Sequence, residues 1–317
     1  MRWLLAILLF TLGLGSAVAE QQCPPGSWRE AAPLPQNRTE VTGASDGHSV
    51  FIVGGMATDP ATDLLAVLRY DPAANSWSTI GRLDSTLNHT GAVVLGGKLY
   101  VIGGYDGKTN APLARVRVID LSTGALSEAA PMPTARGALA AVVLDGKIHA
   151  LGGTTDKSVA THEVFDPATN SWASAAPMLV PRNHLAAAAL GDKLYAFGGR
   201  DEHTMLLDDA EMYDPATDTW SEIAPLPTGR SGIGAAVSSG HIVVFGGEVA
   251  GSNGHTFDNA EAYDPTSSTW TKLAPMPTAR HGLGVAAVGD DIYVVSGGPH
   301  PGLTVSNVNE VLCGPVG

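Results

Sequence analysis

Arginine recurs at matching places along this chain of 317 residues, each time 16 or 17 residues before a pair of adjacent glycines. A guanidinium is planar and donates paired, charge-assisted hydrogen bonds to carboxylates and phosphates. Five guanidiniums facing one space would attract a carboxylate, a phosphate or a sugar acid, even in a chain whose formal charge is -13. These candidate binding residues are Arg38, Arg136, Arg182, Arg230 and Arg280.

The regularity of these arginines also permits a structural interpretation. Acidic residues recur with them and could pair with the guanidiniums, as could backbone carbonyl groups of a neighbouring unit. Recurrence in five of six units favours a structural role for most of the arginines, with one or two left to face a ligand. The recurring acids are Glu163, Glu211, Glu261 and Glu310.

The residues that follow the arginine position vary from unit to unit, so the fold does not require them. In one unit Leu87 replaces the arginine, and a polar pair follows it directly. Asparagine, serine and histidine side chains supply hydrogen-bond donors and acceptors. We therefore expect these variable residues to contribute to binding: Asn88, His89, Asn183, His184, Ser231 and His281.

The densest polar cluster of the chain is the run from Arg200 to His203. A carboxylate and a histidine on opposite sides of a polar opening could act as general acid and base, which makes Glu202, His203 and His184 candidate catalytic residues. The alternative is a solvated surface loop. The histidines lack the short spacing of common metal-binding motifs, so the sequence predicts no metal site and no cofactor.

The elements that must position these residues are short strands. In one unit, residues 185–190 and 194–197 are apolar segments joined by a tight turn. A third strand ends at Asp214, where the following proline cannot donate to a sheet, and Trp220 begins a fourth. A repeat of this length indicates a solenoid or a propeller. The glycine pairs that mark the six units are Gly54-Gly55, Gly103-Gly104, Gly152-Gly153, Gly198-Gly199, Gly246-Gly247 and Gly297-Gly298.

These units resemble the kelch repeat family. The resemblance rests on the double glycine and on an aromatic residue and a tryptophan at similar distances after it, and it covers roughly residues 27–313. In one unit Ile119 and Leu126 take the two aromatic places, which is expected to weaken the packing there. The matching residues are Tyr70, Phe165, Tyr213 and Tyr263, with Trp77, Trp172, Trp220 and Trp270.

The resemblance implies an all-β fold, a six-bladed kelch-type β-propeller with four antiparallel strands per blade. In this family the loops before the first strand and after the double glycine share one face around a central channel. That face, the mouth of the ring, is the usual binding site. The candidate binding residues are expected there.

The ends of the chain complete the last blade when they are aligned with this repeat. Trp28 precedes the first double glycine, so the N-terminal segment supplies a fourth strand without a blade of its own. Residues 309–312 form a third strand that no fourth strand follows. The alignment brings Cys23 next to Cys313, the two cysteines of the chain. It thereby predicts a disulfide that closes the ring. The alternative is a pair of free buried thiols.

Residues 1–19 have the pattern of a secretory signal peptide, with Arg2, an apolar run and small residues ending at Ala19. Cleavage near Ala19 would export residues 20–317 as a single propeller domain, to a periplasmic or extracellular compartment in which disulfides form. The alternative, an uncleaved anchor, needs a longer apolar run. We expect no membrane span in the rest of the chain.

The negative charge opposes nucleic-acid binding. The sequence favours a secreted, monomeric binding module whose arginine-bearing mouth takes a protein, a peptide or an acidic carbohydrate. The alternative is a sugar mutarotase or epimerase similar to the bacterial sialic acid mutarotase, an exported kelch-like enzyme. A copper radical oxidase similar to galactose oxidase is not expected, because its copper site needs a cysteine crosslinked to a tyrosine and both cysteines are assigned to the disulfide.

Overall fold

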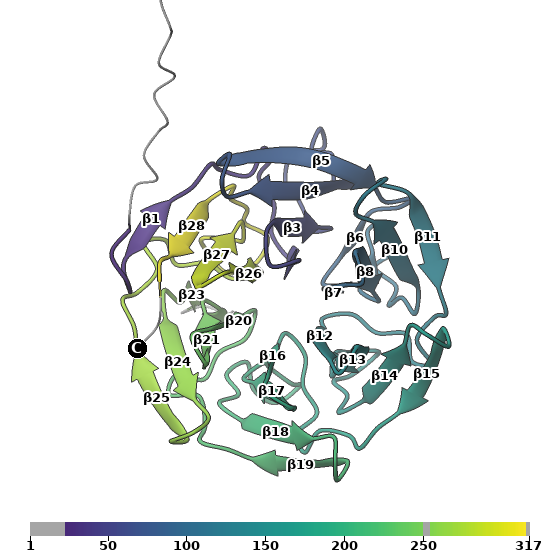
Figure 1. Cartoon of the computed structure of the whole chain (residues 1–317), viewed down its shortest axis with the longest axis vertical. Helices are drawn as coiled ribbons and strands as arrows, with labels where there is room; N and C mark the ends of the chain where they lie inside the picture. The colour runs from purple at the N-terminus through teal and green to yellow at the C-terminus, as the bar shows by residue number, and fades with distance from the viewer. Residues whose placement is uncertain (1–22, 250–253, 315–317) are drawn as a thin grey trace, which may run out of the picture.

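The computed structural model describes residues 23–249 and 254–314. These residues form six four-stranded antiparallel sheets, arranged as blades around a central channel (Figure 1), and no helix occurs among them. The innermost strands of neighbouring blades contact one another around the ring. The predicted six-bladed propeller with four antiparallel strands per blade is confirmed.

The blades are numbered here in chain order of their innermost strands. Blade 1 consists of β2 (Thr42–Ser45), β3 (Val50–Val53), β4 (Ala66–Asp71) and β5 (Ser76–Arg82). Blade 2 consists of β7 (Gly91–Leu95), β8 (Lys98–Ile102), β10 (Val116–Asp120) and β11 (Leu126–Ala129). Blade 3 consists of β12 (Ala140–Leu144), β13 (Lys147–Leu151), β14 (His162–Asp166) and β15 (Ser171–Ser174).

The second half of the ring repeats this order. Blade 4 consists of β16 (Ala186–Leu190), β17 (Lys193–Phe197), β18 (Ala210–Asp214) and β19 (Thr219–Glu222). Blade 5 consists of β20 (Gly234–Ser238), β21 (His241–Phe245), β24 (Ala260–Asp264) and β25 (Thr269–Lys272). Blade 6 consists of β26 (Gly284–Val288), β27 (Asp291–Val295), β28 (Asn309–Leu312) and β1 (Trp28–Glu30). Two short ladders lie in loops, β6 (Leu87–Asn88) with β9 (Tyr105–Asp106) and β22 (Glu248–Val249) with β23 (His255–Thr256).

The hydrophobic core lies between neighbouring blades. The second strand of a blade is buried on both faces, as in β17, where Leu194 to Phe197 are buried in sequence. A strand covered on both sides needs a continuous apolar run instead of an alternating one. In one core cluster Phe197 of blade 4 packs with Val244 and Tyr263 of blade 5. Each blade is thus stabilised by its neighbours.

A tryptophan on the outermost strand links most blades to the preceding one. Its indole N–H donates to an alanine carbonyl in the connection that leaves the preceding blade, as Trp220 does to Ala176 at 2.9 Å. In blade 2, Leu126 has no such donor. There Gly124 approaches the preceding blade so closely that a Cβ atom would lie 2.1 Å from the Ile80 carbonyl oxygen. The equivalent bonds join Trp28 to Ala274, Trp77 to Ala32, Trp172 to Ala130 and Trp270 to Ala224.

We expect Gly124→Ala to lower the free energy of unfolding by about 2 to 4 kcal/mol, because the added methyl group overlaps the Ile80 carbonyl and alanine is disfavoured at a φ of +73°. Gly146→Ala is the matched control, since Gly146 has a φ of +72° and no atom within 4 Å of the new Cβ. The control should lose about 1 kcal/mol in urea unfolding. Equal losses in both variants would contradict the close approach of the two blades.

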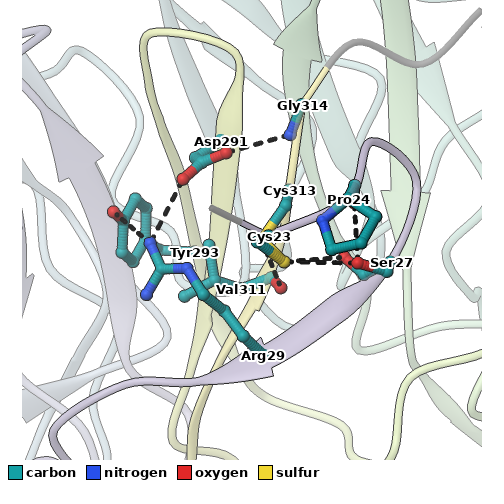
Figure 2. Close-up of a disulfide and its surroundings, with 9 residues drawn as sticks. All are labelled: Cys23, Pro24, Ser27, Arg29, Asp291, Tyr293, Val311, Cys313 and Gly314. Carbon is teal, nitrogen blue, oxygen red and sulfur yellow. Dashed lines mark hydrogen bonds and ion pairs between the residues drawn. A yellow bond between two sulfur atoms is a disulfide. The ribbon is translucent and has the colours of Figure 1, made fainter. Parts of the chain in front are cut away.

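Blade 6 is built from segments near both ends of the described chain. β1 pairs antiparallel with β28, and the two strands lie side by side at the edge of the ring (Figure 1). The Cα atoms of Cys23 and Cys313 are 5.9 Å apart and their sulfur atoms form a disulfide (Figure 2). Backbone hydrogen bonds from Gly26 N to Cys313 O and from Cys313 N to Ser27 O hold the same segments together. The predicted ring closure and disulfide are confirmed.

The predicted signal peptide, residues 1–19, lies outside the described residues, so its cleavage stays a prediction. The disulfide is consistent with an oxidising compartment. Within residues 23–249 and 254–314 no helix has the length and apolar character needed to cross a membrane.

Candidate functional site at the channel mouth

The loops that lead into the innermost strands and the loops that follow the glycine pairs meet on one face of the ring. Backbone pairing joins them, as between Asn183 and Arg200 and between Ser231 and Glu248. In blade 2 the same contact extends into the ladder of β6 with β9. We call this face the mouth, because its loops surround one end of the channel.

The five repeat arginines do not face the mouth. Each of them is fully buried, with 0% of its surface exposed. Arg182 is typical, since it donates to Asp209 O at 2.7 Å and to Glu211 Oε1 at 2.6 Å. The expected arginine-bearing mouth is therefore wrong, and the structural interpretation holds for all five: Arg38, Arg136, Arg182, Arg230 and Arg280.

The planar guanidinium explains this placement. Its five donors can satisfy several backbone carbonyl groups and one carboxylate at once, whereas a buried charge without a partner is costly. Arg38 has no third-strand glutamate and donates instead to Gln36 and to the carbonyl groups of Gly54 and Asp63. Burial lowers the pKa of Arg38 to about 10. The other ion pairs are Arg136–Glu163, Arg182–Glu211, Arg230–Glu261 and Arg280–Glu310.

One residue of each blade belongs to a ring of backbone hydrogen bonds around the channel. Its N–H donates to the ring residue of the preceding blade, as His184 N does to Ala138 O at 3.0 Å, and between blades 6 and 1 the donor is Val41 N. All six have φ between 51° and 70°. Larger side chains are strained in this left-handed region, and two blades have glycine. The ring residues are Glu40, His89, Ala138, His184, Gly232 and Gly282.

Three of the ring residues carry polar side chains that approach one another. Glu40 Oε2 lies 3.1 Å from His89 Nε2, and Glu40 Oε1 lies 3.2 Å from His281 Nδ1. The centroids of the His89 and His184 imidazole rings are 4.9 Å apart. Burial alone would raise the pKa of Glu40, but the surrounding histidines hold that pKa well below its usual range. The Glu40 carboxylate is therefore charged.

His281 faces acceptors with both ring nitrogens. Its Nε2 lies 3.1 Å from the carbonyl oxygens of His300 and Gly302, while Nδ1 faces Glu40. Burial opposes a charge on this ring, but the carboxylates of Glu40 and Glu248 raise the pKa of His281. When protonated, His281 forms an ion pair with one oxygen of the Glu40 carboxylate.

Two asparagines orient the two ring histidines in the same way. Asn88 Oδ1 lies 2.6 Å from His89 Nδ1, and Asn183 Oδ1 lies 2.5 Å from His184 Nδ1. A carboxamide oxygen accepts, so each Nδ1 carries a proton. Nε2 of His184 then accepts from Arg200, and Nε2 of His89 faces Glu40. Burial lowers the pKa of both histidines, and Arg200 adds to the effect at His184. The predicted residues Asn88 and Asn183 thus act by positioning the histidines.

Arg200 and Glu248 complete the group. Arg200 Nη2 donates to His184 Nε2 at 2.7 Å, and its Nη1 donates to Glu248 Oε1 at 3.2 Å. Beyond these side chains the channel is lined largely by glycine and small apolar residues and encloses about 150 Å³. We call the following set the mouth cluster: Glu40, His89, His184, Arg200, Glu248 and His281.

The other predicted site residues lie outside the mouth cluster. Glu202 Oε1 accepts hydrogen bonds from the backbone N–H and the hydroxyl group of Ser158, which in turn accepts one from Asn183 Nδ2. Glu202 is therefore linked to the cluster only through two other side chains. His203 is exposed on the same loop. Ser231 is fully buried and does not reach the channel surface.

Sequence reasoning missed Glu40 as a site residue. It occupies the same repeat position as His89 and His184, two residues after the arginine position, and this alignment is the signal that could have identified it. The three residues lie in blades 1, 2 and 4, separated by 49 and 95 residues, so no short motif connects them. One ligand atom from each lies within 4.8 Å of the others, a spacing at which the three can hold a metal ion.

Known proteins with similar sequences carry kelch repeats. Kelch-like protein 28 of Homo sapiens is 34% identical over 89 residues, which cover 26% of this chain and 16% of that protein. Kelch-like protein 23 of Mus musculus is 29% identical over 86 residues, 27% of this chain and 15% of that protein. Kelch repeat and BTB domain-containing protein 12 of Danio rerio is 31% identical over 86 residues, which cover 25% of this chain and 14% of that protein. The matched segments thus span less than a fifth of these relatives.

A family match covers far more of the chain. The family model described as the KLHDC2/KLHL20/DRC7 Kelch-repeats domain matches residues 88–298, well over half of the sequence. The matched region runs from the mouth loop of blade 2 to the glycine pair of blade 6. This match, the six blades and the recurring glycine pairs show that the chain belongs to the kelch-repeat family.

Proposed function

We propose that this kelch propeller is an exported binding module that holds a protein or peptide ligand on its mouth. The observation that carries the proposal is the mouth cluster, in which charged and polar side chains gather and three of the six occupy ring positions that glycine or alanine fills in other blades. Because the fold does not need these side chains, we assign them to ligand contact. Membership of the kelch-repeat family also supports ligand binding at the mouth, because this face is the usual binding site of kelch propellers.

The rim of the mouth adds apolar contact surface. Among the described residues, three large apolar side chains are 40% to 52% exposed, and all three lie in loops of the mouth face: Leu179, Leu206 and Leu303. The opposite face consists of tight turns that aspartates cap internally, as Asp214 does for Ala216 N. A polar centre with apolar contacts beside it suits a protein partner.

An acidic carbohydrate is a weaker candidate for this mouth. With the five repeat arginines buried, Arg200 remains as the guanidinium of the mouth cluster, and it is bonded to Glu248 and His184. Two carboxylates, Glu40 and Glu248, would repel a sugar acid. The mutarotase alternative drew on the signal-peptide pattern, the chain length and an arginine mouth, and the burial of the arginines removes the last of these.

The double variant Leu206→Asp/Leu303→Asp should weaken ligand binding at least about tenfold, because it places charges where apolar contact is expected. The wild-type mature protein is first used to isolate its partner from the envelope or medium of the exporting cell. Binding of the purified partner is then titrated calorimetrically with the wild-type protein and the variant.

The control is Asp192→Lys, in the turn between β16 and β17 on the opposite face, where the Asp192 side chain is 80% exposed. It should bind the partner as the wild-type protein does. Loss of binding in the control alone would place the interface on the other face. If the protein captures no partner and an acidic sugar raises its melting temperature, the ligand is a carbohydrate and not a protein.

A further inference from the structure

We propose that Glu40, His89 and His184 form a binding site for one divalent transition-metal ion, such as zinc, at the mouth of the channel. The three side chains come from three different blades and converge there. One ligand atom from each lies within 4.8 Å of the other two. Bonds of about 2.0 to 2.2 Å to zinc would bring the ligand atoms somewhat closer together than this, and side-chain rotation supplies that movement.

The donor set selects the class of metal. Two imidazole nitrogens and one carboxylate oxygen suit zinc, copper, nickel, cobalt or iron, whereas calcium and magnesium prefer oxygen ligands alone. Three protein ligands leave at least one coordination position open. The Glu40 and His89 side chains are 12% and 16% exposed, so an ion can enter from solvent and a group of a bound ligand can reach it.

The histidines are oriented as metal ligands usually are. A metal-bound histidine donates its second ring N–H to an acceptor that fixes the tautomer and the ring plane. Asn88 does this for His89 and Asn183 for His184, and both asparagines are buried. The same arrangement in two blades directs Nε2 of both histidines to the channel.

Glu40 Oε2 and His89 Nε2 face each other at a distance of 3.1 Å. His89 Nδ1 donates to Asn88, so Nε2 is the nitrogen left to bind an ion. A cation between these two atoms, whether a proton on Nε2 or a metal ion in its place, is attracted to the Glu40 carboxylate. His281 lies against the other oxygen, Oε1, which leaves Oε2 directed at the proposed ion.

The backbone holds the ligands in place before any ion binds. Glu40, His89 and His184 belong to the closed ring of hydrogen bonds and have φ of 51° to 52°. Larger residues in left-handed conformations occur where function requires them, and the ring closes equally with Gly232 and Gly282. The fixed backbone and the hydrogen bonds from Asn88 and Asn183 limit the freedom that the two histidines lose on binding a metal.

Arg200 competes with the ion. Its guanidinium donates to the His184 Nε2 lone pair at 2.7 Å, and it must give up this bond before His184 can bind a metal. Glu248 lies 3.2 Å from Arg200 and offers the guanidinium another partner. Removal of the Arg200 charge should therefore strengthen metal binding.

The test is calorimetric titration of the mature, oxidised protein with zinc chloride after treatment with a chelator. We expect one zinc ion per chain and a rise in melting temperature on binding. Glu40→Gln and His184→Gln should weaken zinc binding by about 100-fold or more, Asn183→Ala by about 10- to 100-fold, and Arg200→Met should strengthen it. His48→Gln, an exposed histidine in the turn between β2 and β3, is the control and should bind zinc unchanged.

Cobalt supplies a second readout that does not depend on stability. Bound to two imidazoles and a carboxylate, it should give a visible absorption spectrum in the wild-type protein and in His48→Gln but not in His184→Gln. The proposal is overturned if the wild-type protein binds zinc no more tightly than the Glu40→Gln and His184→Gln variants, or if only His48→Gln loses binding. Because no partner is present, failure here leaves the proposed ligand-binding function standing.

Discussion

Loss of the Cys23–Cys313 disulfide should lower the free energy of unfolding by an amount on the order of 5 kcal/mol. The two cysteines are 290 residues apart, and in the chain-entropy model a crosslink that closes so long a loop restricts the unfolded chain strongly. The folded ring is also held by the pairing of β1 with β28. The native fold should therefore persist after reduction, with a lower melting temperature.

The measurement compares urea unfolding of the wild-type protein, oxidised and reduced, with that of the Cys23→Ser/Cys313→Ser variant. The variant should match the reduced protein and should not respond to reductant. Intact mass should show two fewer hydrogens in the oxidised protein. Equal stability of the oxidised and reduced forms would contradict the prediction.

Glu211→Ala should cost about 3 to 5 kcal/mol of stability, because it leaves the fully buried Arg182 guanidinium without its carboxylate. It also removes the acceptor for the backbone N–H groups of Leu179 and Val180. Glu211→Gln keeps an acceptor oxygen and should lose less. Unfolding in urea, followed by circular dichroism, measures both changes.

An exposed ion pair supplies the matched control. Asp192→Asn removes the partner of Lys193 at 3.0 Å, in a pair whose aspartate is 80% exposed. Surface pairs contribute less than about 1 kcal/mol, so this variant should unfold almost as the wild-type protein does. If Glu211→Ala were equally mild, Arg182 would have to reach water in the folded state, which would contradict its burial.

The strands and the ring closure could be predicted from sequence because local patterns determine them. The predicted third strand ending at Asp214 is observed as β18, and Trp220 lies in β19 as expected. The cysteines could be paired because the repeat alignment divides one blade between the two ends of the chain, so that each end supplies the strands that the other lacks. These inferences depend on position along the chain, which a repeat specifies well.

The arginines could not be placed correctly from the sequence. Their positions in the repeat are plain from the sequence, but a repeat position does not determine which way a side chain points. In β-structure a long side chain can turn toward solvent or toward carbonyl groups at a strand end, and the choice depends on partners from other strands such as Glu211. Glu40 was missed for a related reason, because its contacts to His89 and His281 exist only once blades 1, 2 and 6 are adjacent.

The split construction of blade 6 has a consequence for the order of folding. Trp28 in β1 pairs with Leu312 in β28, 284 residues later in the chain, so β1 has no partner strand until almost the whole propeller has been synthesised. Contacts this distant in sequence form slowly. Glu40 in blade 1 meets His281 in blade 6 across the same seam. The contact between Glu40 and His281 thus forms only when the ring closes, and an incompletely closed propeller presents an unpaired strand edge and an unfinished mouth cluster.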